Sequence, residues 1–127
     1  MTVNVSELVK RANAFSKKHG VPITKNQFDG TLDDPVPQLP YMVWLSSHET
    51  ARGADGVNNL KAQDVDFELY TESDNQERES LAAAFEAEVL PDVEYDVLVA
   101  PIPDEDCFQT AYEVRGLLTK TKGASKA

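Results

Sequence analysis

The stretch AQDVDFELYTESDNQ, residues 62–76, contains the end of one predicted element and the start of the next. From Asp64 to Leu69 it alternates acidic with apolar residues, which is the period of a β-strand that buries one face. The apolar set is Val65, Phe67 and Leu69, and the acidic set is Asp64, Asp66 and Glu68. Ser73 or Asp74 then begins a capping-box pattern, which predicts the start of a helix. The stretch therefore predicts a strand and a helix in direct succession.

Two amphipathic helices are expected. The first has Ser6 as its N-cap, runs to about Lys18 and stops at Gly20. The second follows the quoted stretch and ends at Pro91. The apolar positions recur at helical spacing, and they are Leu8, Val9, Ala12 and Phe15 in the first helix and Leu81, Ala84, Phe85 and Val89 in the second. Three acids of the second helix are expected on its solvent side, namely Glu79, Glu86 and Glu88.

Three more strands are predicted on both sides of this unit, at 41–47, 93–100 and 107–118. The proline-rich segment before the first of them is expected to be an extended connector that rests Ile23 and Phe28 against the body. The segment HETARGADGVNNL, which follows the first strand, is expected to be a long polar loop. The acidic turn PIPDED joins the last two strands into a hairpin.

The resulting order is helix, strand, strand, helix, strand, strand. It predicts an α+β fold with a four-stranded antiparallel sheet and both helices on one face. A single domain is expected over residues 1–119, and residues 120–127 are expected to be a flexible basic tail. The predicted core is Phe67, Leu69, Leu81, Phe85, Val97 and Val114.

The composition limits the class of protein. The chain has 127 residues and a formal net charge of −10, which argues against a nucleic-acid-binding domain. Its one cysteine, Cys107, cannot form an internal disulfide, which favours a reducing intracellular setting. Neither a signal peptide nor a membrane span is predicted, so the expected protein is soluble.

The charges are unevenly distributed. Residues 1–27 carry five bases and one acid, residues 28–113 carry three bases and 21 acids, and the last 14 residues carry four bases and no acid. Such polarity suits association between like copies, basic end to acidic flank, although it could equally serve solubility alone. The candidate basic interface is Lys10, Arg11, Lys17 and Lys18.

Catalytic and ligand-binding patterns are weak. His19 and His48 are read as solvated side chains, because they lie far apart, form no i,i+4 ligand pair and have polar surroundings. Cys107 is read as a structural thiol, because no arranged base accompanies it. The segments DGTLDD and PDEDC lack the ligand alternation of a calcium loop, and RGADG lacks the ending of a phosphate-binding loop. The prediction is a protein that is not an enzyme and has no catalytic residues, no cofactor and no metal site.

Asp64, Asp66 and Glu68 are interpreted as an electrostatic surface rather than as ligands or catalysts. Carboxylates two residues apart on an open strand project into water, and they lack the enclosing groups that a metal ion or a raised pKa requires. Glu94 and Asp96 add charge nearby. This acidic face is expected to line a channel or to meet a basic neighbour.

Several short motifs resemble a family of small tail-completion proteins of long-tailed phages and prophages, also called tail terminators or minor tail proteins. They match in order over about residues 39–118. The motifs are Leu39-Pro40-Tyr41, Ala54-Asp55-Gly56, Glu68-Leu69-Tyr70-Thr71 and Tyr112-Glu113. Gly56 stands where the family tends to have asparagine, and both basic ends lie outside the match.

The resemblance implies a structural virion protein with no reaction. It implies a ring, commonly of six copies, that caps the tail tube, meets a head-completion or connector protein, and lets DNA pass without specific binding. The protein would be assembled in the host cytoplasm and located in the neck region, away from membranes. The long loop would then reach a neighbouring subunit or the tube, through His48, Arg52, Asp55, Asn58 and Asn59.

Two other classes remain open from the residues alone. The first is an acidic inhibitor that mimics DNA and binds the basic groove of a nuclease or another nucleic-acid-binding protein. The second is an enzyme that acts through the three carboxylates of the quoted strand.

Overall fold

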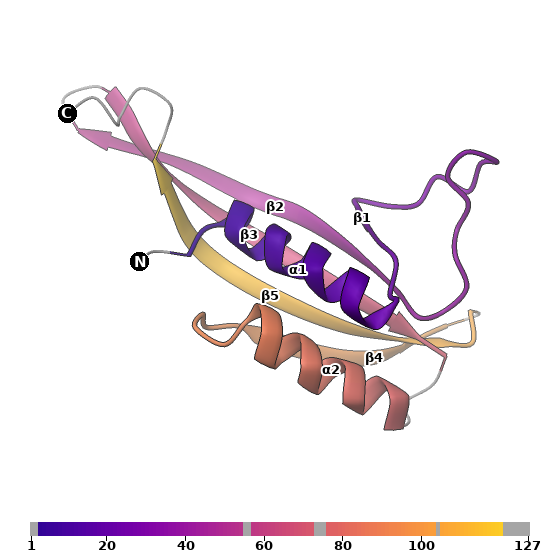
Figure 1. Ribbon diagram of the computed structural model, residues 1–127. Coiled ribbons are helices and arrows are strands. Elements are labelled where there is room, and N and C mark those ends of the chain that lie inside the picture. The colour runs from indigo at the N-terminus through magenta and orange to yellow at the C-terminus, as the bar shows by residue number, and fades with distance from the viewer. Residues whose placement is uncertain (1–2, 55–56, 73–75, 104, 121–127) are drawn as a thin grey trace.

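The computed structural model describes residues 3–54, 57–72, 76–103 and 105–120. Within these ranges two helices, α1 (Val5–His19) and α2 (Gln76–Val89), pack on one face of a five-stranded sheet (Figure 1). The strands lie in the order β1-β2-β3-β5-β4, and their bounds are β1 Ile23–Lys25, β2 Tyr41–Ala54, β3 Val57–Thr71, β4 Asp96–Ile102 and β5 Cys107–Lys120. The predicted α+β class is confirmed.

The sheet is mixed, which corrects the prediction of four strands that are all antiparallel. The four predicted strands are β2 to β5, and their pairings are antiparallel. A fifth strand, β1, pairs with β2 in parallel, and the backbone N–H of Met42 donates to the carbonyl of Pro22 at 2.8 Å. The sequence does not reveal β1 because it is three residues long and lies inside the proline-rich connector.

Helix α1 begins earlier than predicted. Its N-cap is Asn4 rather than Ser6, and the Asn4 Oδ1 accepts from the Glu7 backbone N–H at 2.9 Å. The earlier start adds Val5, which is 9% exposed, to the apolar stripe. The helix ends as predicted at Gly20, whose φ of 67° lies in the left-handed region that glycine adopts most easily.

The prediction of a long loop at HETARGADGVNNL, residues 48–60, is wrong. Strand β2 continues to Ala54 and β3 begins at Val57, and these two residues face each other across the hairpin. Strand β5 pairs with β3 as far as Lys120, so a third strand supports the hairpin. The extra pairing supplies backbone hydrogen bonds that local composition does not predict.

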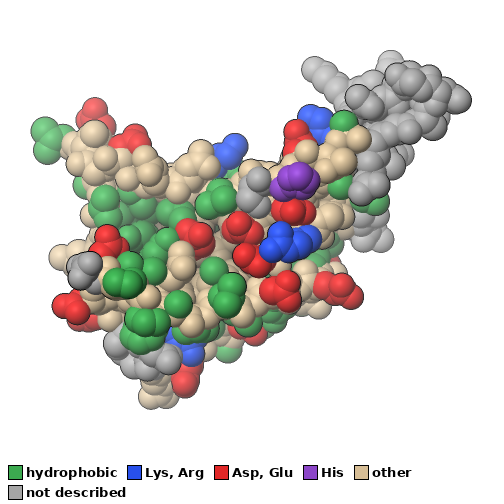
Figure 2. All heavy atoms as spheres, turned by 180° about the vertical axis from the view of Figure 1, so that it is seen from behind, with side chains coloured by type: hydrophobic (Ala, Val, Ile, Leu, Met, Phe, Trp, Pro, Cys, Tyr) green, Lys and Arg blue, Asp and Glu red, His purple; other side chains and the backbone are tan. Residues whose placement is uncertain are grey.

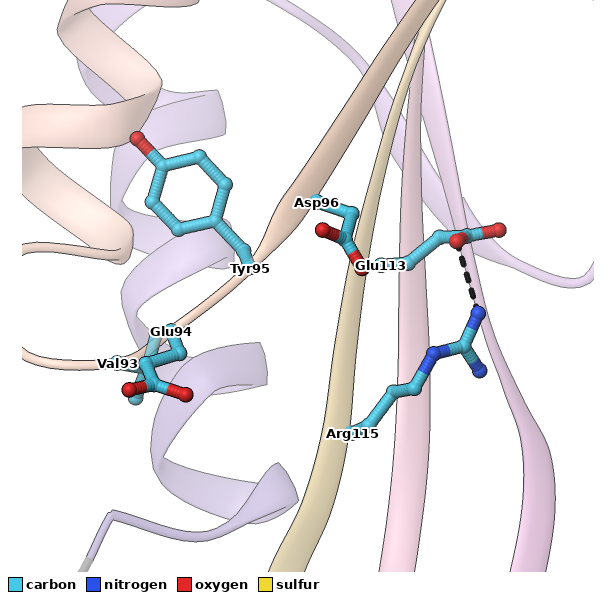
Figure 3. Close-up of a pocket in the computed structure, with 6 residues that line it drawn as sticks. All are labelled: Val93, Glu94, Tyr95, Asp96, Glu113 and Arg115. Carbon is cyan, nitrogen blue, oxygen red and sulfur yellow. Dashed lines mark hydrogen bonds and ion pairs between the residues drawn. The ribbon is translucent and has the colours of Figure 1, made fainter.

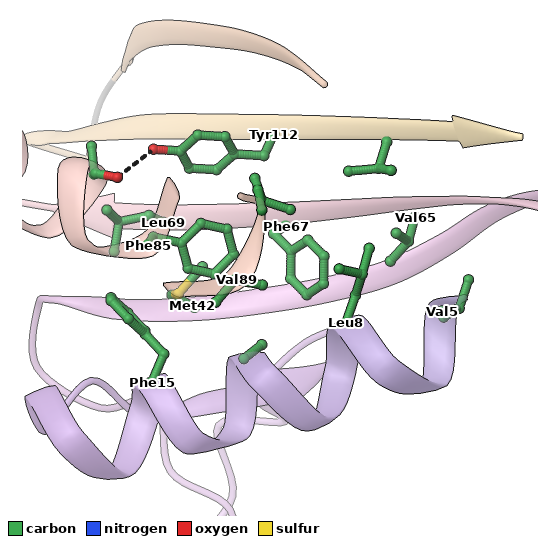
Figure 4. Close-up of a cluster of buried hydrophobic side chains, with 14 of the residues drawn as sticks. Val5, Leu8, Phe15, Met42, Val65, Phe67, Leu69, Phe85, Val89 and Tyr112 are labelled. Atoms are coloured by element: carbon green, nitrogen blue, oxygen red, sulfur yellow. Dashed lines mark hydrogen bonds between the residues drawn. The ribbon is translucent and has the colours of Figure 1, made fainter. Parts of the chain in front are cut away.

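One hydrophobic cluster joins the helices to the sheet (Figure 4). At its centre the ring of Phe85 lies 5.2 Å from that of Phe15, 5.4 Å from Phe67 and 5.0 Å from Tyr112, measured between centroids. Phe67, Leu69, Phe85 and Val114 are buried as predicted.

Two predicted core residues are not buried. Leu81 is only partly buried at the margin of the cluster. Val97 is 47% exposed, because β4 lies at the edge of the sheet. The predicted caps of the second helix and most of the predicted tail, residues 121–127, lie outside the described residues.

Candidate functional site

The face of the sheet opposite the helices is open, and acidic side chains gather near its centre (Figure 2). On β3 the alternation works as predicted, because Val65, Phe67 and Leu69 are fully buried beneath the helices. Asp64, Asp66 and Glu68 therefore lie on the open face, where all three are half-buried rather than fully exposed.

Asp64 has a structural role that the sequence does not reveal. Its side chain is 16% exposed, its Oδ1 accepts from the Gly116 backbone N–H at 2.9 Å, and its Oδ2 lies 3.5 Å from Arg115 Nη1. The register between β3 and β5 shifts at this point, and Gly116 has a φ of 69°. Asp64 thus binds a backbone group at a β-bulge. This corrects the prediction from the alternation, which had its carboxylate projecting freely into water.

Glu68 is also held by its neighbours. Its Oε1 accepts from the Tyr70 hydroxyl at 2.9 Å, and Gln109 Nε2 donates to the same hydroxyl at 3.0 Å. Burial, followed by the bond to Glu68, raises the pKa of Tyr70 to about 12. This polar group joins β3 to β5 on the open face.

The register adds two acids to the face. Asp66 on β3 lies beside Glu113 on β5, and Glu113 in turn lies beside Asp96 on β4. Three carboxylates therefore form a row across three strands. Arg115 supplies a counter-charge, since its Nη2 is 2.8 Å from Glu113 Oε1.

A shallow hollow lies at the β4 end of this row (Figure 3). It is lined by Val93, Glu94, Tyr95, Asp96, Glu113 and Arg115. Both Glu94 and Asp96 are exposed, so the hollow does not remove carboxylates from water. Within the described ranges, no cluster of three or more His, Cys, Asp or Glu side chains could hold a metal ion. The chemistry of this face is that of a hydrated negative surface.

Four of the five predicted inter-subunit residues lie on the β2–β3 hairpin instead of a loop. His48 is exposed, and its Nε2 lies 3.1 Å from Thr50 Oγ1. Arg52 is paired with Leu60, and Asn58 with Gly53, at the level of the backbone. Asp55 lies outside the described residues. Asn59 is a position of β3. The structure thus places His48, Arg52, Asn58 and Asn59 along one hairpin.

Two of the four residues of the predicted basic interface on α1 form ion pairs with acids of the same chain. Arg11 binds Asp92 at 2.7 Å and Glu7 at 3.3 Å, and Lys18 lies 3.5 Å from Glu88. The hydrogen bond to Asp92 is the main cause of a raised Arg11 pKa and of a lowered Asp92 pKa. Lys10 and Lys17 are exposed and remain as the basic surface of the helix.

The two histidines differ. His48 is exposed as predicted, whereas His19 is half-buried. The His19 Nε2 lies 2.8 Å from Glu88 Oε2, and its ring lies 4.5 Å from that of Phe15 at a tilt of 38°. The bond from His19 lowers the pKa of Glu88. Cys107 is buried, and that burial raises the pKa of its thiol, as expected for a structural cysteine.

A feature that sequence reasoning missed is the exposed apolar edge of the sheet. Val97, Leu98 and Val99 on β4 are 47%, 60% and 42% exposed. A signal was present in the sequence, because residues 97–102 contain no charged side chain and do contain Pro101, which is typical of an edge strand.

Comparison with known proteins does not assign this chain to a family. No protein-family model matches the sequence, and no curated protein matches it. Neither of the described helices is long and apolar enough to cross a membrane.

Proposed function

We propose that this chain is a structural virion protein, a phage tail terminator that forms a ring at the head-proximal end of the tail tube and joins it to the neck. The observation that carries the proposal is a charge asymmetry between the two sides of the sheet. It accompanies the motif resemblance over residues 39–118 and gives like copies a way to associate side by side.

The asymmetry follows the two helices. Helix α1 lies nearer β1 and β2, and α2 lies nearer β5 and β4 (Figure 1). Helix α1 carries four Lys or Arg residues and one acid, and the next strand carries Lys25. Helix α2 carries four acids and one arginine, and the segment from Leu90 to Asp106 contains no basic residue. The helix layer is thus basic on the α1 side and acidic on the α2 side.

This arrangement favours head-to-tail contacts. When the basic side of one copy meets the acidic side of the next, the contact uses two different surfaces, and such contacts close into a ring if the rotation allows it. Opposite charges also orient the encounter. Contacts between like sides bring charges of the same sign together and are therefore disfavoured.

The acidic open face suits a subunit of a ring through which DNA must pass. Double-stranded DNA binds basic surfaces by releasing counterions, so a basic wall would hold the phosphates. The row of Asp66, Glu113 and Asp96 repels them. In the proposed ring this face lines or borders the channel, and DNA passes without specific binding.

The test is electron cryo-microscopy of tailed particles whose genome encodes this chain, prepared with and without an intact gene. The proposal expects ring-shaped density of this fold between tube and neck, and heads that fail to join tails when the gene is inactivated. Complete infectious particles that lack the protein would refute it.

The acidic face also favours a second candidate, an inhibitor that mimics DNA. That candidate expects a one-to-one complex with a nuclease or another nucleic-acid-binding protein, in which DNA and this chain compete. Nuclease activity on linear DNA in host extract, measured with and without added protein, separates the two functions. Strong inhibition together with absence from virions would favour the mimic.

A further inference from the structure

We propose that β4 is a docking strand whose free edge pairs with the free edge of β2 in a second copy of this chain; the inference rests on the proposed ring and names its subunit contact. The first evidence is exposure. Val97, Leu98 and Val99 leave 47%, 60% and 42% of their surface accessible, although they are consecutive apolar residues in a strand. Monomeric proteins usually protect sheet edges with charge, and between Val97 and Ile102 β4 has none.

The backbone of β4 is suited to a short pairing. Pro101 faces Phe108 on β5, and proline has no N–H to donate to that strand. Residue 101 must therefore occupy a non-hydrogen-bonded pair, in which backbone groups point away from the partner strand. By the same alternation Val97 and Val99 direct their N–H groups outward, while Pro101 limits the length of the pairing.

The opposite side of the sheet offers a matching edge. Strand β1 pairs with β2 only at Met42, Val43 and Trp44. Beyond Trp44 no described strand pairs with β2 on that side. Between two register shifts, the stretch His48–Arg52 runs regularly against β3. Its five residues equal the span from Val97 to Pro101, so the two edges are comparable in length.

Charge identifies the occupant as a second copy in head-to-tail orientation. Exposed acids flank both ends of β4, and they are Glu94, Asp96, Glu105 and Asp106. The β2 side presents exposed bases, namely Lys25 beside β2 and Lys10 and Lys17 on α1. The one exposed acid of the stretch His48–Arg52 is Glu49, whose Oε2 lies 3.7 Å from Lys61 Nζ. Pairing β4 with β4 of another copy would place acids against acids, whereas pairing it with β2 places acids near bases.

The contact has a consequence for the acidic face. Strand pairing across the boundary makes the sheets of neighbouring copies continuous, so their open faces adjoin. The carboxylate rows of successive copies then form one uninterrupted negative wall. Strand β4 would thereby set both the assembly and the surface that DNA meets.

Crosslinking tests the pairing directly. In a Cys107→Ala background, Thr50→Cys and Leu98→Cys place single thiols on the open face of β2 and β4. Treated with a short bismaleimide at high protein concentration, an equal mixture of the two variants should give a crosslinked dimer, and each variant alone should not. A chain that carries both cysteines should give a ladder that ends at the ring size. A dimer from Leu98→Cys alone, or no product in any sample, would overturn the proposal.

A charge substitution provides the second test, with a matched control. Leu98→Lys should raise the dissociation constant for self-association ~10-fold or more, because it places a charge in an apolar contact. Leu32→Lys makes the same change at a fully exposed connector residue and should leave association unchanged. Sedimentation equilibrium measures both, and circular dichroism checks the fold. Equal association of the two variants would contradict a role for β4.

The outcomes separate this inference from the proposed function. If β4 and β2 crosslink but the protein is absent from tails, the pairing stands and the virion assignment fails. If the protein is present in the neck and the Leu98→Lys particles assemble normally, the virion assignment stands and the β4 contact fails.

Discussion

Strands β3 and β4 are both rich in apolar residues, yet they occupy opposite environments. The inward residues of β3, which are Val65, Phe67 and Leu69, are fully buried. On β4, Val97 and Val99 point to the same side of the sheet but remain 47% and 42% exposed. Strand β3 lies in the middle of the sheet beneath both helices, whereas β4 has a neighbour on one side only. Alternation thus predicts which residues share a face, and position in the sheet decides whether that face is covered.

The largest expected effect tests whether α2 covers the centre of the sheet and closes the core. Replacing Phe85 with alanine should lower the free energy of unfolding by about 3–5 kcal/mol, the usual range for a buried aromatic. The ring packs against aromatic rings of α1, β3 and β5. Denaturant unfolding measures the loss. A cost below about 1 kcal/mol would mean that α2 does not close the core.

A matched pair of leucines compares the two strands directly. Leu69→Ala on β3 should cost about 2–5 kcal/mol, because Leu69 is fully buried. Leu98→Ala on β4 should change the stability of the monomer by less than about 0.5 kcal/mol, because Leu98 is 60% exposed. Urea titrations at a concentration where the protein is monomeric provide both values. Similar costs at the two sites would remove the contrast between centre and edge.

A smaller effect distinguishes structural from surface carboxylates on β3. Asp64→Ala should lower the free energy of unfolding by about 1 kcal/mol, since it leaves the Gly116 N–H without its acceptor. Asp64→Asn retains the acceptor oxygen and should retain most of that stability. Thermal unfolding of the two variants gives the comparison. If alanine proved as stable as asparagine, the bulge would not depend on this bond.

The smallest effect concerns the contact between the two helices at His19 and Glu88. The bond from His19 lowers the Glu88 pKa from its ordinary value of 4.5, so the ionised carboxylate stabilises the fold. That stability is complete above the unfolded value of 4.5 and is lost as the pH falls through the lower folded pKa. Unfolding followed between pH 5 and pH 3 should therefore show a decline that Glu88→Gln reduces.

Glu79→Gln is the control for that measurement, because Glu79 is an exposed carboxylate on the same helix. It should leave the decline in place. If the free energy of unfolding declined equally with falling pH in the wild type and in Glu88→Gln, the contact between the helices would not depend on the ionisation of Glu88.

The hairpin shows where local patterns are insufficient. Composition predicted a loop around His48 because the segment is polar and contains glycine, but this segment of β2 pairs with β3, and β5 in turn pairs with β3 from Leu60 onward. Such pairing joins residues far apart in the chain, as Leu60 and Lys120 are. The same limitation hid β1, which exists only because β2 offers it an edge.

For the acidic face too, some features could be predicted from the sequence and others could not. The sequence identified the acids of β3 and the face that they share. It could not identify the row from Asp66 through Glu113 to Asp96, because these residues come from three strands whose register is a tertiary property. Nor could it show that Asp64 binds a bulge, since the bulge arises where β5 shifts against β3.

The sequence by itself determined the two helices, four of the strands and the inward residues of β3, because these depend on periodicity within one segment. It also determined the uneven charge and the absence of a recognisable catalytic pattern. Only the tertiary structure decided that β4 lies at an edge and that β2 and β3 form a long hairpin. It also decided that Lys18 of α1 forms an ion pair with Glu88 of α2. Each of these depends on which segments become neighbours, and burial, register and ion pairing are properties of neighbours rather than of local sequence.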